Sequence, residues 1–251
     1  MSNMNQKSKT LITLIVATIS AAGISVAQLT QPNSIIEKSD TLYLLGDYYN
    51  FKEKGADDSI DFKGGTVGYF HEFNNQNNLN VEFTYLNGSM NYSHTNVSTG
   101  NFVVIKYSDD IYRLKGMYGF DKKGIISCGL EYIYWQNDYS GTWNFTTTRF
   151  SNTYNANFVL ADVRLMYPFE LLSNADQQLK IIPCADVGFG AAFGSDDSKA
   201  AHKLEGKCAL VYTLGRNSII LEGGYNLIGT QGDGNDYYKG IFVRAGYSCS
   251  W

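Results

Sequence analysis

From Thr41 to the last residue, apolar positions recur at every second residue rather than every third or fourth. In residues 159–167, for instance, Val, Ala, Val, Leu and Tyr alternate with Leu, Asp, Arg and Met. Side chains alternate between the two faces of a strand, so this period predicts β-strands with one apolar face. Ten strands are expected, at residues 41–52, 59–73, 78–91, 102–120, 124–140, 152–168, 178–194, 203–214, 218–229 and 237–251.

The connections between these strands alternate between short turns and longer polar segments. The shorter ones are at residues 74–76, 121–123, 168–176 and 215–217, and the longer at 53–58, 92–100, 141–151, 195–202 and 230–236. An even number of up-and-down strands places both ends of the sheet at one rim, although eight strands plus a loop hairpin also fit the pattern. We expect a bulge at Gly64–Gly65, where the apolar phase changes. Pro183 lacks a ladder donor and predicts a bulge or a rim position.

The N-terminal segment has the organisation of a secretory signal peptide. Lys7 and Lys9 precede an apolar or small-residue run from Leu11 to Ile24, and small residues follow up to Ala27. This order predicts cleavage after Ala27, with residues 28–40 as a periplasmic lead-in to the barrel.

Composition narrows the class further. Aromatic residues make up 14% of the chain and charged residues only 18%, which excludes an intrinsically disordered protein. No segment after residue 27 approaches the length of an apolar transmembrane helix. The net charge is −4, and residues 1–27 contain two lysines and no acid, so the remainder carries −6. This balance gives no basic surface for nucleic acid.

The last strand identifies the kind of β-protein. The segment from Ile241 to Trp251, with Tyr247 and a terminal aromatic residue, resembles the C-terminal assembly signal of bacterial outer-membrane β-barrels. The resemblance is to small porin-like or surface-antigen barrels in general. It implies a single closed antiparallel up-and-down transmembrane β-barrel over residues 41–251, located in the outer membrane of a Gram-negative bacterium. Its implied partners are membrane lipids, lipopolysaccharide and the barrel assembly machinery. The outward aromatic residues expected at the lipid face are Tyr112, Tyr134, Tyr167, Tyr212, Tyr225, Tyr247 and Trp251.

Charged residues stand on the opposite, inward phase of the strands, with the two signs nearly balanced. The predicted lumen charges are Glu82, Arg113, Lys115, Glu131, Asp162, Arg164, Lys180, Asp186, Glu205, Lys207, Glu222 and Arg244. A turn at residues 121–123 places Arg113 opposite Glu131, and a slip of two residues would substitute Lys115. Two interpretations stay open, a salt-bridged plug that fills a narrow barrel and the selectivity lining of a pore. Ten strands lie near the filled end of the range of barrel sizes.

The sequence contains few features that would indicate a catalytic or metal-binding site. A hydrolase that resembles the omptins would need an Asp-x-His sequence, which is not present, and no cofactor or metal motif occurs. The acidic segment at residues 233–236 lacks the spacing of a calcium loop. Four cysteines within strands are expected to be free thiols: Cys184 inward, and Cys128, Cys208 and Cys249 outward. We therefore expect a structural or surface-interaction role through extracellular loops that bind an unknown ligand. A narrow porin, an outer-membrane hydrolase and a soluble periplasmic β-protein are the alternatives.

Overall fold

The computed structural model describes residues 40–53, 59–73, 77–96, 101–120, 125–143, 149–174, 177–194, 198–231 and 237–251. The signal peptide expected at residues 1–27 and its cleavage after Ala27 lie outside the described residues. The expected lead-in at residues 28–40 also lies outside them, except that Asp40 already belongs to the first strand. Within the described part, no helix is long and apolar enough to cross a membrane.

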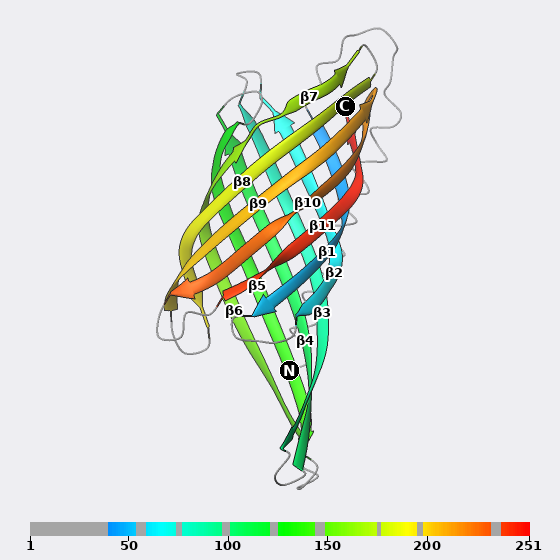
Figure 1. Ribbon diagram of the computed structural model, residues 1–251. Helices are drawn as coiled ribbons and strands as arrows, with labels where there is room; N and C mark the ends of the chain where they lie inside the picture. The colour runs from blue at the N-terminus through cyan, green and yellow to red at the C-terminus, as the bar shows by residue number, and fades with distance from the viewer. Residues whose placement is uncertain are drawn as a thin grey trace. The chain divides into compact units, whose positions relative to one another are not determined.

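Eleven strands make up the regular structure of the described residues, and ten of them form a closed barrel (Figure 1). The strands are β1 (Asp40–Glu53), β2 (Ile60–Glu72), β3 (Asn78–Asn96), β4 (Asn101–Gly119), β5 (Ile126–Trp143), β6 (Arg149–Met166), β7 (Phe169–Ser173), β8 (Gln177–Phe193), β9 (Ser198–Leu214), β10 (Asn217–Gln231) and β11 (Tyr237–Ser250). Each pairs antiparallel with the next strand in the chain, except that β6 pairs with β8 and not with β7, which pairs with the start of β8. The pairing of β1 with β11 completes the ring. The expected closed ten-stranded barrel is thereby confirmed.

The two rims of the barrel are distinguished by the chain ends. Thr41 lies opposite Ser250, so β1 begins and β11 ends at the same rim, which we call the terminal rim. The other is the distal rim. A two-residue turn at Gly215–Arg216 joins β9 to β10 at the terminal rim, and Gly215 has a φ of 59°, a conformation that suits glycine.

Two prolines, Pro168 and Pro183, lie at the break between β6 and the short eleventh strand, β7. The sequence predicts a turn from residue 168 to 176, but the chain resumes a strand at Phe169 and pairs with the first residues of β8. Pro168 therefore separates β6 from β7 without forming the predicted turn. Across this interruption, the carbonyl oxygen of Pro183 accepts a hydrogen bond from the backbone N–H of Tyr167, at 3.1 Å. Because the N and C=O of a strand residue point to the same side, the missing donor of Pro183 faces the break between β6 and β7.

The bulge expected at Gly64–Gly65 is absent. Both ladders of β2 run through these glycines without a shift of register. Phe62 is fully buried inside the barrel, whereas Tyr69, on the other phase of β2, is exposed on the outside. The apolar phase of β2 changes because its distal part places apolar side chains inward and its terminal part places them outward. The sequence pattern alone does not distinguish such an inversion from a bulge.

The outer surface of the barrel wall carries large apolar side chains. Leu130 is 66% exposed, and Val163 and Ile219 are also exposed on this surface. A ladder of tyrosines crosses it toward the distal rim, because Tyr85, Tyr112 and Tyr134 are successive partners on β3, β4 and β5. The hydroxyl of Tyr85 donates a hydrogen bond to Asp110, and that of Tyr134 donates to Asn155. This pattern of apolar wall and hydrogen-bonded tyrosines is typical of a transmembrane barrel with an interfacial aromatic girdle.

Four strands continue beyond the rest of the barrel at the distal rim (Figure 1, bottom of the view). On β3, residues 89–96 pair only with β4, since the pairing with β2 ends at Gly88. On β6, residues 149–156 pair only with β5, since the pairing with β8 begins at Asn157. We call residues 89–96, 101–108, 138–143 and 149–153 the distal extension. Of the residues predicted as long polar loops, 92–96, 141–143 and 149–151 thus belong to paired strands.

Candidate functional site

The interior of the barrel contains a balanced set of buried charges, which we call the charged layer. Its members are Glu82, Arg113, Lys115, Glu131, Asp162, Arg164, Asp186, Lys203, Glu205, Lys207, Glu222 and Arg244, six acids and six bases. Each of these side chains is no more than 11% exposed, and Lys115 and Glu131 are about 1% exposed or less. Charges this deep need partners, because an unpaired ion inside a protein is strongly unfavourable.

The ion pairs of the charged layer connect strands on different sides of the barrel. Lys115 on β4 places its Nζ 2.8 Å from Asp186 on β8 and 2.9 Å from Asp162 on β6. Arg164 donates two hydrogen bonds to Asp186, at 2.8 and 3.1 Å. Lys203 on β9 contacts Glu131 and lies 2.8 Å from Asp162. The layer therefore ties the walls of the barrel together across its lumen.

The remaining pairs continue the same network. Lys207 lies 3.2 Å from Glu205 and 3.5 Å from Glu222, and Arg244 contacts Glu222. Glu82 lies 3.9 Å from the guanidinium groups of both Arg164 and Arg244. Every acid of the layer thus has a cation within 4 Å.

The register between β4 and β5 is the second of the two that the sequence allowed. Lys115, not Arg113, is the direct partner of Glu131, because the turn is two residues longer than expected and Gly119 pairs with Ser127. Arg113 lies opposite Ile133 but still reaches Glu131 diagonally with its Nε. Long side chains inside a narrow barrel therefore pair beyond their direct neighbours.

Eleven of the twelve lumen charges named from the sequence belong to the charged layer, and Lys180 does not. Lys180 lies near the start of β8, where one neighbour is Val211 on β9 but the other is Glu170 on β7 instead of a residue of β6. Its side chain is 29% exposed and its Nζ is 3.8 Å from the exposed Glu170. The alternation of β8 correctly assigns Lys180 to the inward phase, but the closed wall of the barrel ends before this residue.

Lys203 is a member that sequence reasoning missed. It stands on the same phase of β9 as Glu205 and Lys207, and this phase could have identified it. Two other buried acids were also missed. Asp47 accepts a hydrogen bond from Thr66 at 2.6 Å, and Asp109 accepts one from Asn137.

Toward the distal rim, the interior changes from charged to apolar. A second set of buried side chains, the apolar layer, fills the barrel there: Tyr49, Phe51, Phe62, Leu86, Ile111, Ile133, Trp135, Phe158, Leu160, Ala192, Ala201, Ile228 and Phe242. Tyr49 stacks on Phe242 at 5.0 Å, and Phe62 meets Trp135 edge to face at 5.9 Å. A Cβ on Gly88 would lie 2.7 Å from the ring of Phe62, so this glycine makes room for the aromatic side chain.

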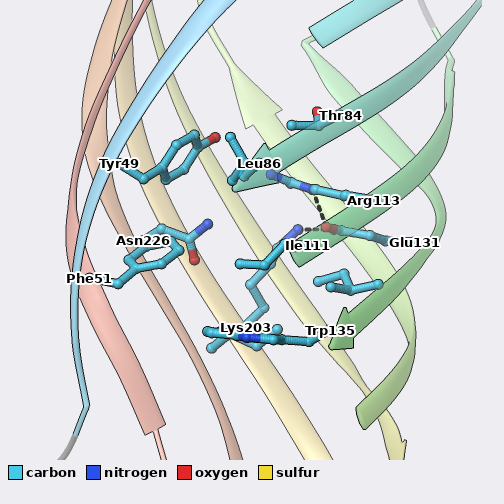
Figure 2. Close-up of a pocket in the computed structure, with 12 residues that line it drawn as sticks. Tyr49, Phe51, Thr84, Leu86, Ile111, Arg113, Glu131, Trp135, Lys203 and Asn226 are labelled. Carbon is cyan, nitrogen blue, oxygen red and sulfur yellow. Dashed lines mark hydrogen bonds and ion pairs between the residues drawn. The ribbon is translucent and has the colours of Figure 1, made fainter. Parts of the chain in front are cut away.

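The two layers meet at a small cavity of about 30 Å³ (Figure 2). Arg113, Glu131 and Lys203 line one side of it, with their ion pairs drawn in the figure. Phe51 and Trp135 line the apolar side. A space of this size is close to that of a single water molecule. At this depth the lumen is therefore packed by side chains.

Beyond the apolar layer, a larger hollow opens at the base of the distal extension, which contributes Ile105, Tyr107 and Tyr139 to its lining. We call it the distal groove. Its volume is about 430 Å³, and it is lined by Glu53, Ile105, Tyr107, Trp135, Asn137, Tyr139, Tyr154, Asn155, Ala156, Phe158 and Tyr238. The sequence interpretation placed these tyrosines within strands but assigned none of them to a face, and so did not predict the groove. Its floor is the apolar layer, to which Trp135 and Phe158 belong.

No protein-family model matches this chain, and no curated protein matches it. Solved structures of outer-membrane barrels are similar to it in fold. The transport unit of the autotransporter AIDA-I from Escherichia coli is 9% identical over 90% of this chain and 94% of that one, with a TM-score of 0.46. The outer-membrane protease OmpT from Escherichia coli is 11% identical over 89% and 100%, with a TM-score of 0.42. The attachment invasion locus protein Ail of Yersinia pestis is 11% identical over 84% and 99%, with a TM-score of 0.37. At these values the likeness identifies no function.

The class of the protein follows from its own structure. A closed antiparallel barrel, an apolar outer wall and a charged interior together define a barrel of the outer-membrane type. The generic resemblance of the C-terminal segment to such barrels is thereby confirmed at the level of fold.

Proposed function

We propose that this protein is an integral bacterial outer-membrane barrel that acts in surface interaction through its distal extension, rather than in catalysis or solute passage. The observation that carries the proposal is the position of the distal groove. It lies where β4, β5 and β6 continue beyond the other strands, and the distal ends of β1 and β11 complete its lining with Glu53 and Tyr238. In such barrels the rim opposite the chain ends is the extracellular one. The groove would therefore face the outside of the cell.

The outer face of the distal extension supports this orientation. Lys106, Asp138, Ser140 and Thr153 point outward there, where the barrel wall below carries Leu and Val. Such a change from apolar to polar surface is expected where a strand leaves the membrane. Outer-membrane lipids and lipopolysaccharide would contact the wall, and the assembly machinery would recognise β11.

The packed lumen supports a structural interior rather than a pore. The charged layer and the apolar layer follow one another along the barrel, and both consist of buried side chains. A barrel of about eight strands is just filled by side chains, whereas aqueous channels need about sixteen. We therefore expect the refolded protein to give no stable single-channel steps in a planar bilayer, and regular steps would favour the narrow porin instead.

The surface role is tested by shortening the distal extension while keeping the barrel. Residues 90–107 and 139–152 are each replaced by an Asn-Gly turn, which closes the hairpins at the pairs Ser89–Ser108 and Asp138–Thr153. Pairing of β2 with β3 and of β6 with β8 is untouched. The wild type and this variant, both checked for a folded barrel by heat-modifiable migration on gels, are applied to arrays of peptides and glycans. Binding by the wild type alone supports the proposal. No binding by the wild type, or equal binding by both, overturns it.

A further inference from the structure

The distal groove is large enough for a small organic group or a side chain of a partner. Its volume of about 430 Å³ falls within the range of small-molecule pockets. Such pockets combine apolar and aromatic walls with a few polar groups that determine what binds. The identity of these two sets of residues therefore indicates the class of ligand.

The walls of the distal groove are mainly aromatic rings that neighbour one another across strands. Tyr107 on β4 is the direct partner of Tyr139 on β5, with ring centroids 6.2 Å apart. Tyr139 and Tyr154 on β6 are 5.6 Å apart and nearly parallel, with 11° between their planes. At the inner end, Trp135 and Tyr238 are 4.4 Å apart. The groove thus presents several aromatic faces around one space.

The charged lining of the groove is acidic. Glu53, at the distal end of β1 and opposite Tyr238 on β11, supplies a carboxylate to the lining. Among the described residues that line the groove there is no lysine or arginine. Deeper in, Asn137 is turned toward a second acid, because its amide donates a hydrogen bond to Asp109. Aromatic faces attract cations through their quadrupole, and a carboxylate adds a direct attraction.

Anionic ligands do not fit this lining, since a carboxylate would repel them and no base in it would pair with them. A flat cation fits best, because a guanidinium group stacks on aromatic faces as well as pairing with a carboxylate. The near-parallel rings of Tyr139 and Tyr154 offer such a surface.

We propose that the distal groove binds an organic cation, above all a guanidinium group, between its tyrosine faces and Glu53. This inference rests on the proposed surface role, since it names the chemistry of the ligand that the distal extension would take. The guanidinium group could belong to a free small molecule or to an arginine side chain of a peptide.

The test is calorimetric titration of the full barrel in detergent micelles. The probes are N-acetylarginine amide, its neutral isostere N-acetylcitrulline amide, a blocked Gly-Arg-Gly peptide and methyl β-glucoside. We expect both arginine probes to bind and both neutral probes to bind at least about tenfold more weakly, in line with about 1–2 kcal/mol of desolvated cation–π attraction. Equal affinity of the two arginine probes indicates that the groove recognises the arginine side chain alone. Tighter binding of the peptide indicates a polypeptide ligand.

Variants connect the binding to the groove. Tyr139→Leu is expected to weaken binding of N-acetylarginine amide about five- to thirtyfold, and Glu53→Gln about two- to fivefold. The matched control is Asp138→Asn. Asp138 lies between Asn137 and Tyr139 on β5, faces the outer side, and accepts a hydrogen bond from Thr153 at 2.6 Å. This control should bind as the wild type does, and all variants must show heat-modifiable migration.

The outcomes separate this inference from the proposed function. If the wild type binds N-acetylcitrulline amide or the glucoside as well as the arginine probes, the cation inference fails while the surface role stands. If arginine binding is unchanged in both Tyr139→Leu and Glu53→Gln, the groove is not the site and the inference fails. Failure of the proposed function itself would appear on the arrays, as no binding by the wild type or as equal binding by the wild type and the shortened variant.

Discussion

The charged layer and the apolar layer fill the same barrel, but they hold its walls together in different ways. In the charged layer, each side chain depends on particular partners, as Lys115 does on Asp162 and Asp186. In the apolar layer, side chains such as Phe62 and Leu160 are fully buried among many neighbours without specific pairing. Ion pairs thus fix register and orientation, whereas apolar packing fills volume. The difference predicts that the two layers respond differently to the same kind of mutation.

The outer surfaces of the two layers do not differ in this way. Leu130 outside the charged layer and Ile241 outside the apolar layer are both exposed apolar residues of the wall. The lipid-facing side therefore stays apolar while the interior changes from charged to apolar along the barrel. It follows that the inner phase, not the outer one, distinguishes this barrel from a water-filled one.

The largest effect is expected from removing one cation of the charged layer. Lys115→Met leaves the buried carboxylates of Asp162 and Asp186 short of a partner and should lower the free energy of unfolding by about 3–5 kcal/mol. Urea titration of the protein in lipid vesicles, followed by gel migration, measures the change. The matched control is Lys180→Met at the terminal rim, where the pair with Glu170 is exposed and should contribute less than about 1 kcal/mol. Equal losses of unfolding free energy in the two variants would refute the contrast between the charged layer and the exposed ion pair at the terminal rim.

A somewhat smaller effect is expected in the apolar layer. Leu160→Ala removes a fully buried side chain and should cost about 2–5 kcal/mol, because its neighbours only partly close the cavity. Leu165→Ala on the same strand is the control, since Leu165 is 54% exposed on the outer wall, where lipid fills the space. Leu165→Ala should lower the free energy of unfolding clearly less than Leu160→Ala does. If the control were the more costly of the two, the interior at Leu160 would not be a packed layer.

These contrasts also explain which parts of the molecule the sequence predicts. The ten barrel strands were predictable because most of them keep a two-residue period, and most of the charged layer was predictable because charges such as Asp162 and Arg164 stand on the polar phase. The apolar layer was not predictable, because residues on both phases of the strands are apolar toward the distal rim. On β2 this produced a predicted bulge where the structure has a change of face between Phe62 and Tyr69.

The distal groove was beyond prediction for a related reason. Its rings come from β4, β5, β6 and β11, and their proximity depends on registers that the sequence leaves open by two residues. The pairing of Lys115 rather than Arg113 with Glu131 is an example of that uncertainty. Polar composition at residues 141–151 also suggested a loop, whereas β5 continues to Trp143 and β6 begins at Arg149, with Thr142 paired to Arg149.

The smallest of the expected effects concerns a hydrogen bond at the level where the two layers approach each other. Thr66 on β2 is buried, donates to the carboxylate of Asp47 at 2.6 Å, and contacts the hydroxyl of Thr84 at 2.7 Å. Thr66→Val keeps the shape of the side chain but removes a donor from a buried acid, so it should lower the free energy of unfolding by about 1.5–3 kcal/mol.

The distal extension offers a matched pair of the same chemistry in water. Thr153 donates to the carboxylate of Asp138 at 2.6 Å, but both groups lie on the exposed outer face. Thr153→Val should therefore change stability by no more than about 0.5 kcal/mol, because water replaces the lost donor. The same urea titration measures both variants. If Thr66→Val were as mild as Thr153→Val, water would have to reach Asp47, and the interior would be open to solvent at that level rather than packed. The comparison of two threonines thus tests the packed lumen independently of any conductance measurement.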